Sequence, residues 1–294
     1  MILSRLIGGL GNQMFQYAAG RALADRLGAE LLLDPRALQH TLALQPYTRR
    51  GYALGQFKLR ANLASPSDLQ NWPKWAVEIG MRLPFARPLF RRWHFESAIT
   101  FDPEVQALKA PVCLVGYWQS ERYFIDRADQ IRADFTLQQP LAGANAALLE
   151  RAHTGSSVGL HVRRGDFANL KAAAEVHGLC SIDYYRRAIS LVRERSPDFH
   201  FLVFSDDPDW ARLELPLDPS ALFVDGNAAA PELDLALMRA CQHHIIANSS
   251  FSWWAAWLGY SPEQIVIAPT PWHASPKLDA RDIAVSRWQY ISRI

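Results

Sequence analysis

Cysteine is scarce in this sequence, with three residues among 294. Cys113, Cys180 and Cys241 are too few and too widely spaced for a disulfide framework or a zinc cluster, and an odd number suits a reducing compartment. We therefore expect three buried, unreactive thiols in a cytoplasmic protein.

An excess of charge of either sign is also lacking. Thirty-one Lys and Arg residues stand against twenty-nine Asp and Glu residues, which leaves a formal net charge of +2. This balance excludes the strongly basic surface with which proteins wrap nucleic acids, so we expect no nucleic-acid partner. It remains compatible with a local basic pocket for one small anionic ligand.

Long apolar runs are missing as well. No run approaches the ~18 residues that a transmembrane helix needs. Gly8 and Gly9 interrupt the N-terminal apolar stretch before the core of a signal peptide could form. We expect a soluble, cytoplasmic protein, and a transient association with a membrane surface, peripheral at the inner membrane, stays open.

Aromatic side chains, in contrast, are abundant. The chain has ten Trp, fourteen Phe and nine Tyr residues within a hydrophobic content of 49%, so it should fold into large globular domains. Aromatic residues at this density often stack on sugars or bases in addition to filling a core. We expect core support from Trp253, Trp254 and Trp257, and candidates for a sugar-binding cleft in Trp72, Trp75, Trp93 and Trp118.

Strands alternate with helices along most of the chain, which predicts parallel sheets. An apolar run at 2–7, a glycine turn at 8–11, a helical pattern up to Gly28 and a second run at 30–33 form the start of a βαβ unit. We expect domains over 1–154 and 155–294. Further strands are predicted at 112–115, 158–162, 199–204, 222–224, 244–247 and 264–268, with helices at 142–153, 183–195 and 231–241.

Polar residues follow the predicted strands of the second half where each strand ends. In an open α/β sheet these carboxyl ends share one edge, and ligands bind there. The residues are Arg163, Arg164, Gly165 and Asp166 after one strand, Ser205, Asp206 and Asp207 after the next, and Asn248, Ser249, Ser250 and Ser252 after the run at 244–247.

The two arginines are the strongest of these signals. Guanidinium groups match phosphate oxygens in a bidentate geometry and keep their charge. Alternation along the strand places His161 and Arg163 on one face and Arg164 on the other, so one Arg is expected to bind phosphate while the other supports the loop. The alternative is a structural ion pair with Asp166 or another acid at this edge.

The serines at 249–252 precede an apolar helix. Hydroxyls and unpaired backbone N–H groups at a helix N-terminus form an anion site, although simple capping would use the same residues. Together with the arginines this pattern predicts a diphosphate held from two sides. Asp207 and Asp209 also have the spacing of a metal-binding carboxylate pair, but the arginines already supply the positive charge, so we expect no metal.

Two other classes of protein remain as alternatives. An NAD-linked oxidoreductase would fit the opening βαβ unit and Asp34, but Met14 stands where the third glycine of the dinucleotide fingerprint belongs. A sugar-binding module without catalysis would fit the Trp content and leaves the phosphate-type site unexplained. Asn12 and Gln13 at the glycine turn are expected to meet ligand hydroxyls or to cap the helix.

Four motifs together resemble the bacterial α-1,2-fucosyltransferases, glycosyltransferase family 11. They are GGLGNQMFQY at 8–17, GYWQSERYF at 116–124, HVRRGDF at 161–167 and NSSFSWW at 248–254, and they span most of the chain. The third motif alone is shared in looser form by α-1,6- and protein O-fucosyltransferases, whereas the full set is specific.

The resemblance implies a GT-B-like α/β fold of two Rossmann-type domains with parallel sheets facing a cleft. The N-terminal domain would be the acceptor side and the C-terminal domain would bind GDP-fucose. The implied reaction is cofactor-free, metal-independent transfer of fucose from GDP-fucose, with inversion, to the 2-hydroxyl of a terminal galactose. The acceptor would be an oligosaccharide or a lipid-linked glycan, as in bacterial O-antigen synthesis.

The family pattern also assigns roles to single residues. Arg163 would hold the pyrophosphate with Arg164 in support, and the phosphates would meet Ser249, Ser250 or Ser252. Guanine would meet His161 and one of Asp206 and Asp207, while Asn12 would face the cleft. For the general base, Asp166, Glu175 and His177 follow the arginines closely, and we favour Asp166.

Overall fold

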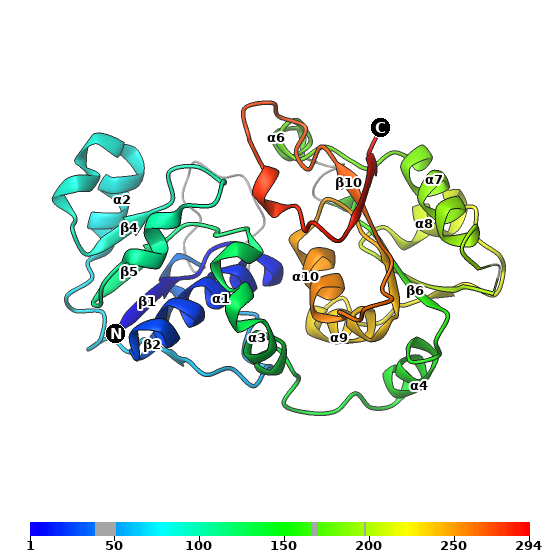
Figure 1. Cartoon of the computed structure of the whole chain (residues 1–294), viewed down its shortest axis with the longest axis horizontal. Helices are drawn as coiled ribbons and strands as arrows, with labels where there is room; N and C mark the ends of the chain where they lie inside the picture. Colours follow the sequence, from blue (N-terminus) through cyan, green and yellow to red (C-terminus); the bar gives the residue numbers. More distant parts are fainter. Residues whose placement is uncertain (39–50, 166–167, 169, 197) are drawn as a thin grey trace. The chain divides into compact units, whose positions relative to one another are not determined.

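The chain folds into two α/β units, each built on its own parallel sheet. The computed structural model describes residues 1–38, 51–165, 168, 170–196 and 198–294. The first unit comprises Met1–Thr136 and Arg281–Ala284, and the second comprises Leu137–Ala280 and Val285–Ile294 (Figure 1). Two α/β units with parallel sheets confirm the predicted fold class.

The first sheet has the predicted strand, glycine turn and helix at its centre. β1 (Ile2–Arg5) lies between β2 and β5, so that Ile2 pairs with Leu31 on one side and with Val112 on the other. Every side chain of these three strands is buried, which explains why most of them are apolar; the polar exceptions are Ser4, Arg5 and Asp34. The sheet order is β3-β2-β1-β5-β4, with β2 at Leu31–Asp34, β3 at Asn62–Leu63, β4 at Trp93–Phe95 and β5 at Val112–Val115.

Helix α1 packs on this sheet, and short helices form most of the remainder of the first unit. Strands β3 and β4 have two and three residues, too few to show a period in the sequence, and they were not predicted. The helices are α1 (Leu10–Leu27), α2 (Lys74–Arg82) and α3 (Ala128–Asp134), with 3-10 helices η1 (Pro35–Ala37), η2 (Pro84–Leu89), η3 (Pro103–Ala107), η4 (Glu121–Tyr123) and η5 (Ile125–Arg127).

The second sheet has β6 at its centre, between β7 and β9. The register aligns His161 with Phe204 and Val162 with Ser205, so β6 and β7 end side by side. The order is β11-β10-β9-β6-β7-β8, with β6 at Ser157–Val162, β7 at His200–Ser205, β8 at Leu222–Phe223, β9 at His243–Ile245, β10 at Val266–Thr270 and β11 at Gln289–Ser292.

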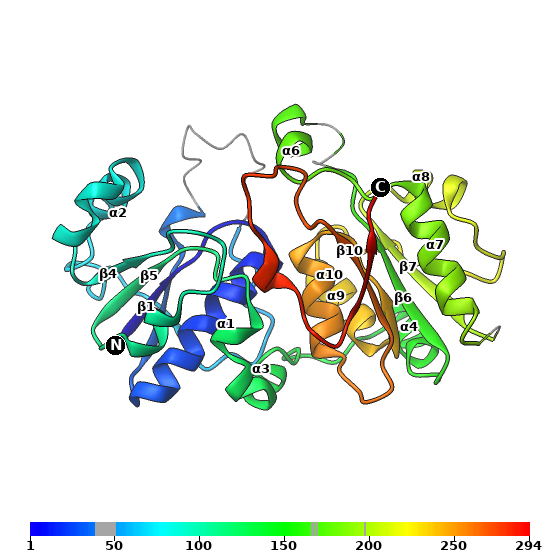
Figure 2. The ribbon, with the colours of Figure 1, turned by 45° about the horizontal axis from the view of Figure 1, so that its top comes forward.

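Helices cover both faces of the second sheet. Helices α7 and α8 lie on one face, where Tyr184 and Ala211 join the buried core, and α9 and α10 lie on the other (Figure 2). The helices are α4 (Ala144–Ala152), α6 (Lys171–Val176), α7 (Ile182–Arg193), α8 (Pro208–Glu214), α9 (Pro231–Ala240) and α10 (Ser250–Leu258).

The chain passes between the units at three places, after residues 136, 280 and 284, which the sequence did not reveal. The first unit ends at Thr136, and α4 packs on α9 and β6, so residues 137–154 belong to the second unit and not to the first as predicted. Near the C-terminus, η6 (Arg281–Ile283) returns to the first unit. There the Asp282 carboxylate accepts from the Phe101 N–H at 2.8 Å and pairs with Arg122 at 3.0 Å.

Candidate functional site

The ends of β6 and β7 bring Arg163 and Asp206 together. Each residue directly follows its strand, and the parallel register puts them at the same level of the sheet. Arg163 Nη1 lies 2.6 Å from Asp206 Oδ2, and each side chain is about a quarter exposed (23% and 26%). This is an ion pair at the edge where a ligand is expected, and it is accessible to one.

Arg164 supports the loop, as the alternation of the strand predicts. Its backbone N–H donates to Asp206 Oδ1 at 2.8 Å, and its Nε donates to Asp207 Oδ2 at 3.1 Å. The guanidinium also stacks over the Trp210 ring, 4.1 Å from the centroid. Trp210 was not singled out from the sequence, because nothing in the sequence marks a Trp on α8 as a partner of this Arg.

The segment Ser205–Asp207 serves the scaffold of the site. The Asp207 N–H donates to Ser205 Oγ at 2.9 Å, and Asp207 Oδ1 accepts from the Trp210 N–H at 3.3 Å to cap α8. Asp206 uses both carboxylate oxygens on the arginines. All three side chains thus have partners within the protein, whereas the family pattern assigns one of Asp206 and Asp207 to guanine.

Gly165 allows this packing by its lack of a side chain. A Cβ at that position would lie 2.5 Å from Asp206 Oδ2, closer than carbon and oxygen can approach without a shift. The glycine therefore lets the backbone pass against the carboxylate that holds Arg163.

His161 lies beneath the ion pair and is 6% exposed. Burial lowers the pKa of its imidazole to about 4, with Asp206 acting in the opposite direction and Arg163 in the same one. The ring is therefore neutral near pH 7. Its Nδ1 has no hydrogen-bond partner among the described residues, and its ring lies 5.4 Å from that of Phe251 in the first turn of α10.

The N-terminus of α10 follows β9, the other neighbour of β6. Ser249 precedes the helix without using its side chain as a cap, and Ser249 and Ser250 are half-buried. Ser252, in contrast, is completely buried, and its hydroxyl donates to the carbonyls of Ala247 and Ser249 at 3.4 and 3.3 Å. Only Ser249 and Ser250 of the predicted serines are placed to meet a ligand.

Asn248 is also buried, at 3% exposure, and its side-chain amide makes hydrogen bonds within the protein. Its Nδ2 donates to the carbonyls of His177, Gly178 and Trp272 at 2.9, 3.1 and 3.2 Å, and its Oδ1 accepts from the Cys180 thiol. The prediction that Asn248 contacts substrate is therefore replaced by a structural role, since this side chain joins two loops beside the site.

Those loops carry two histidines. The rings of His177 and His273 lie 5.3 Å apart, and burial lowers the pKa of each, to about 4 for His273. Arg163 contributes to the lowered pKa of His177, so the pair belongs to the same region of the unit. His273 was missed, although it follows the carboxyl end of β10, at the edge where ligands of α/β sheets bind.

The glycine turn of the first unit has a separate set of contacts. Asn12 Oδ1 accepts from Gln119 Nε2 at 2.8 Å, which joins two of the four motifs. Gln13 is completely buried, donates to the Gly8 and Gly51 carbonyls and accepts from the Ala53 N–H. Its amide is fully used, so Gln13 holds the segment at 51–53 and does not meet a ligand hydroxyl.

The predicted aromatic candidates divide by burial. Trp72 and Trp118 are 1% and 0% exposed and belong to the core, because their indole rings pack inside the first unit, so they do not line a cleft as expected. Trp75 is 55% exposed. The core role expected of the residues on α10 is confirmed, since Trp253, Trp254 and Trp257 are all completely buried.

The three thiols are buried, as predicted. Burial raises the pKa of Cys180 to about 11 and that of Cys113 and Cys241 to about 12, so none is a thiolate near pH 7.

Asp166, the favoured general base, lies outside the described residues. In the part of the chain that is described, no group of three or more His, Cys, Asp or Glu side chains is arranged to hold a metal ion. Among the same residues, no helix combines the length and the apolar character needed to cross a bilayer.

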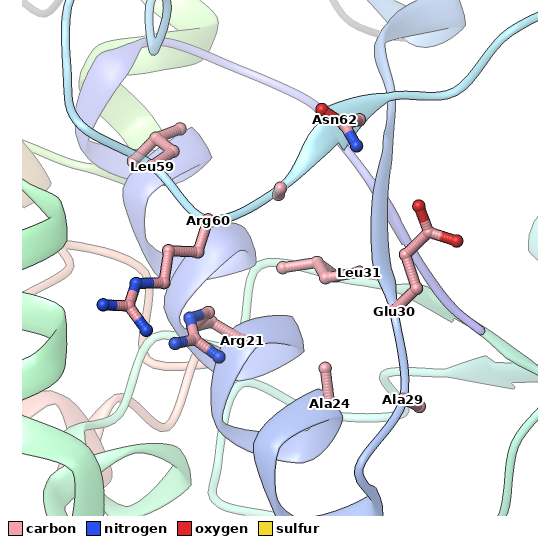
Figure 3. A pocket seen from close by; sticks show the side chains of 9 residues that line it. Arg21, Ala24, Ala29, Glu30, Leu31, Leu59, Arg60 and Asn62 are labelled. Atoms are coloured by element: carbon pink, nitrogen blue, oxygen red, sulfur yellow. The ribbon is translucent and has the colours of Figure 1, made fainter.

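The first unit has a hollow of about 290 Å³ that is lined by none of the predicted site residues (Figure 3). Its lining includes Arg21, Glu30, Arg60 and Asn62, and Arg21 pairs with Asp134 at 3.1 Å. Glu30 and Asn62 lie at the amino ends of β2 and β3, whereas ligands of α/β sheets bind at the carboxyl ends. We therefore assign this hollow no role in the site.

Comparison with known proteins identifies the family. Residues 98–292 match the sequence family described as Glycosyl transferase family 11. The chain is 33% identical to an alpha-1,2-colitosyltransferase of Escherichia coli, over 100% of this chain and 99% of that protein. It is 29% identical to the O-antigen biosynthesis glycosyltransferase WbnK of Escherichia coli, over 92% and 94% of the two chains.

More distant comparisons agree. A galactoside alpha-(1,2)-fucosyltransferase 1 of Lagothrix lagotricha is 29% identical, over 85% of this chain and 63% of that protein. The fold is similar to that of the fucosyltransferase NodZ from Bradyrhizobium, with a TM-score of 0.51 at 17% identity, over 87% of this chain and 91% of that chain. The chain belongs to glycosyl transferase family 11 and is a glycosyltransferase with a GT-B-type fold.

Proposed function

We propose that this glycosyltransferase transfers L-fucose from GDP-β-L-fucose to the 2-hydroxyl of a terminal galactose, with inversion and without a metal ion or other cofactor. The observation that carries the proposal is the position of Arg163 and of the N-terminus of α10, which follow the neighbouring strands β6 and β9. The ring of His161 in β6 also contacts the ring of Phe251 in the first turn of α10. A guanidinium and a helix N-terminus on one edge of a sheet suit a diphosphate.

In this proposal the Arg163–Asp206 pair is the resting state of the phosphate site. A diphosphate carries more negative charge than one carboxylate, so it can recruit the guanidinium. Asp206 is about a quarter exposed and still accepts from the Arg164 N–H, so it is not left buried and unpaired. As the C1–O bond of the donor breaks, charge grows on the departing GDP. Arg163 and the backbone N–H groups in the first turn of α10 then bind the transition state more tightly than they bind the donor.

Guanine recognition is assigned mainly to His161. Its Nδ1 retains hydrogen-bonding capacity, whereas Asp206 and Asp207 use their carboxylates on Arg163 and Arg164. The two acids then act as positioning residues for the arginines. Ser249 and Ser250 are the proposed phosphate ligands, and Asn12 remains a proposed substrate contact from the first unit.

The acceptor proton needs a base. In an inverting transfer the galactose 2-hydroxyl oxygen forms the new bond to fucose C1, its proton passes to the base, and GDP leaves with the electron pair of the broken bond. Asp166 is proposed for this role. Its competitor is His177, whose lowered pKa keeps it neutral and able to accept a proton, while Glu175 is more exposed.

The names of the relatives support the α-1,2 linkage and a glycan acceptor of the O-antigen kind. They also give a second candidate donor. Colitose is fucose without the 3-hydroxyl group, and the relative with 33% identity is an α-1,2-colitosyltransferase. A GDP-linked colitose would use the same phosphate site, so the two candidates differ only in contacts to that hydroxyl.

The experiment that tests the proposal is a transfer assay with purified protein, EDTA and lactose or another β-galactoside, supplied with GDP-fucose or GDP-colitose in parallel. We expect an α-1,2-linked product, identified by NMR. The same assay is run without EDTA, and transfer that occurs there but not in the presence of EDTA would overturn the metal-independent mechanism. A product from GDP-colitose alone would replace fucose by colitose.

A further inference from the structure

Large apolar side chains are exposed together on α2 and η2. Among the described residues, thirteen large hydrophobic side chains are more than a third exposed, and five of them lie within 75–89. Phe85 and Leu89 are each 80% exposed, and Trp75, Met81 and Leu83 are between 44% and 55% exposed. A cluster of this kind on a soluble unit marks an interaction surface.

The segment is held firmly from beneath, so the exposure does not come from a detached loop. Ala76, Val77 and Gly80 of α2 are buried. A Cβ at Gly80 would lie 2.3 Å from the Phe95 ring, which shows how closely α2 packs on β4 at the edge of the first sheet (Figure 1). The Arg87 Nε donates to the Gly80 carbonyl at 2.9 Å and joins η2 to α2.

The same segment concentrates positive charge. Residues 74–92 contain five basic side chains and one acidic one, Glu78, which gives +4 where the whole chain has +2. Arg82, Arg91 and Arg92 are exposed. The aromatic rings of Trp75, Phe90 and Trp93 lie in contact in the same segment, with centroids 6.0 Å apart for the first pair and 6.1 Å apart for the second.

We propose that α2 and η2 form a docking surface for an anionic lipid bilayer, which we call the 74–92 surface. Apolar tips that insert at the level of the headgroups, surrounded by arginines that pair with lipid phosphates, are the features of an interfacial membrane segment. Arginine and tryptophan suit this position because each has an apolar body and a polar end.

The charge selects a bilayer over a second copy of the chain. Two copies joined through this surface would bring two segments of +4 against each other at close range. An anionic bilayer supplies both missing partners, a negative surface and an apolar layer. The surface would bring the first unit to lipid-linked glycans, a consequence that rests on the proposed function.

Flotation of the full chain with phospholipid vesicles tests the proposal. We expect binding to vesicles of phosphatidylcholine with phosphatidylglycerol, little binding to phosphatidylcholine alone, and loss of binding in high salt. The Phe85→Ser/Leu89→Ser and Arg91→Glu/Arg92→Glu variants should each lower the partition coefficient at least ~10-fold.

Matched controls come from the second unit. Leu213→Ser removes a side chain that is 81% exposed on α8, and Arg151→Glu/Arg195→Glu reverses two exposed charges. Both should bind vesicles like the wild type, and all four variants should unfold at nearly the wild-type temperature, because the substituted side chains are at the surface.

Three results would overturn the proposal. These are no binding to anionic vesicles by the wild type, equal losses in the control variants, or a dimer in light scattering that the Phe85→Ser/Leu89→Ser variant alone abolishes. The assay contains no donor sugar. A failure here is therefore distinct from a failure of the transfer reaction.

Discussion

Arg163 Nη1 and Asp206 Oδ2 lie 2.6 Å apart at the ends of two parallel strands that end at the same level. Neither residue is deeply buried, so the pair is accessible to a ligand. A cation held ready by a carboxylate, beside a helix N-terminus, is what the proposed diphosphate site needs in a protein of nearly neutral net charge.

Arg163→Ala should abolish most of the transfer. Removal of one positively charged contact to a departing oxyanion typically costs ~10²-fold or more in kcat. Steady-state kinetics with GDP-fucose would measure the loss, with Arg195→Ala as an exposed control in the same unit. Turnover near the wild-type rate in a folded Arg163→Ala variant would exclude the assigned role.

The Asp206→Asn variant distinguishes two roles of this carboxylate, the positioning of Arg163 and the recognition of guanine. If Asp206 positions Arg163, the variant should lose up to about 100-fold in kcat because Arg163 is misplaced, and should still prefer GDP to ADP and UDP. Calorimetry with the three nucleotides measures that preference. A collapse of the preference for GDP would instead show that the carboxylate reads guanine.

Gly165→Ala should produce the same defect by a steric route. The added Cβ would lie 2.5 Å from Asp206 Oδ2 and displace the carboxylate from Arg163. The matched control is Gly155→Ala, where the nearest atom is 3.4 Å away. Kinetics of Gly165→Ala combined with Asp206→Asn should show little additional loss; fully multiplied losses would mean that the glycine acts independently of Asp206.

Asn248→Ala should affect stability more than ligand binding. The variant removes one donor from each of three backbone carbonyls, of which that of His177 still accepts from the Ala274 N–H at 3.1 Å, and should lower the free energy of unfolding by about 2–4 kcal/mol. Urea denaturation measures this. Ser249→Ala/Ser250→Ala should show the opposite behaviour, with weaker GDP binding and nearly unchanged stability. The reverse result for the two variants would exchange the roles given to these residues.

Stability should fall as the pH drops from about 6.5 to about 4. His161, His244 and His273 have pKa values near 4 in the folded protein because of burial, against 6.5 for the free side chain. In this range the unfolded chain binds more protons, and each fully buried ring contributes up to ~3 kcal/mol that is present above pH 6.5 and lost toward pH 4. Urea denaturation at several pH values tests this, and a flat profile would contradict it.

The sequence predicted those parts of the fold that have clear periodicity. The βαβ start and the alternation after residue 157 appear where expected. Strands β1 and β6 have four and six consecutive buried residues, and α7 has one apolar face, so the sequence pattern reveals both kinds of element. Strands β3, β4 and β11, the division at Thr136 and the return of η6 were missed. Their formation depends on contacts such as Asp282 with Phe101, far apart in the sequence.

The site was predicted in outline, but the functions of individual polar side chains were not. Arg163, Asp206 and Ser249 lie at the predicted edge. Gln13, Asn248 and Ser252 looked equally suitable as ligands, yet each uses its hydrogen bonds inside the protein. A sequence does not distinguish an amide that meets substrate from one that joins two loops, because both are polar residues beside a turn.

The most direct measurement is product analysis by NMR after incubation of the purified protein with GDP-fucose, lactose and EDTA, with the Arg163→Ala variant in parallel. We predict fucose in α-1,2 linkage to galactose from the wild type and at least ~10²-fold less product from the variant. Absence of product from the wild type with both GDP-fucose and GDP-colitose, across several galactosides, would contradict the proposed function.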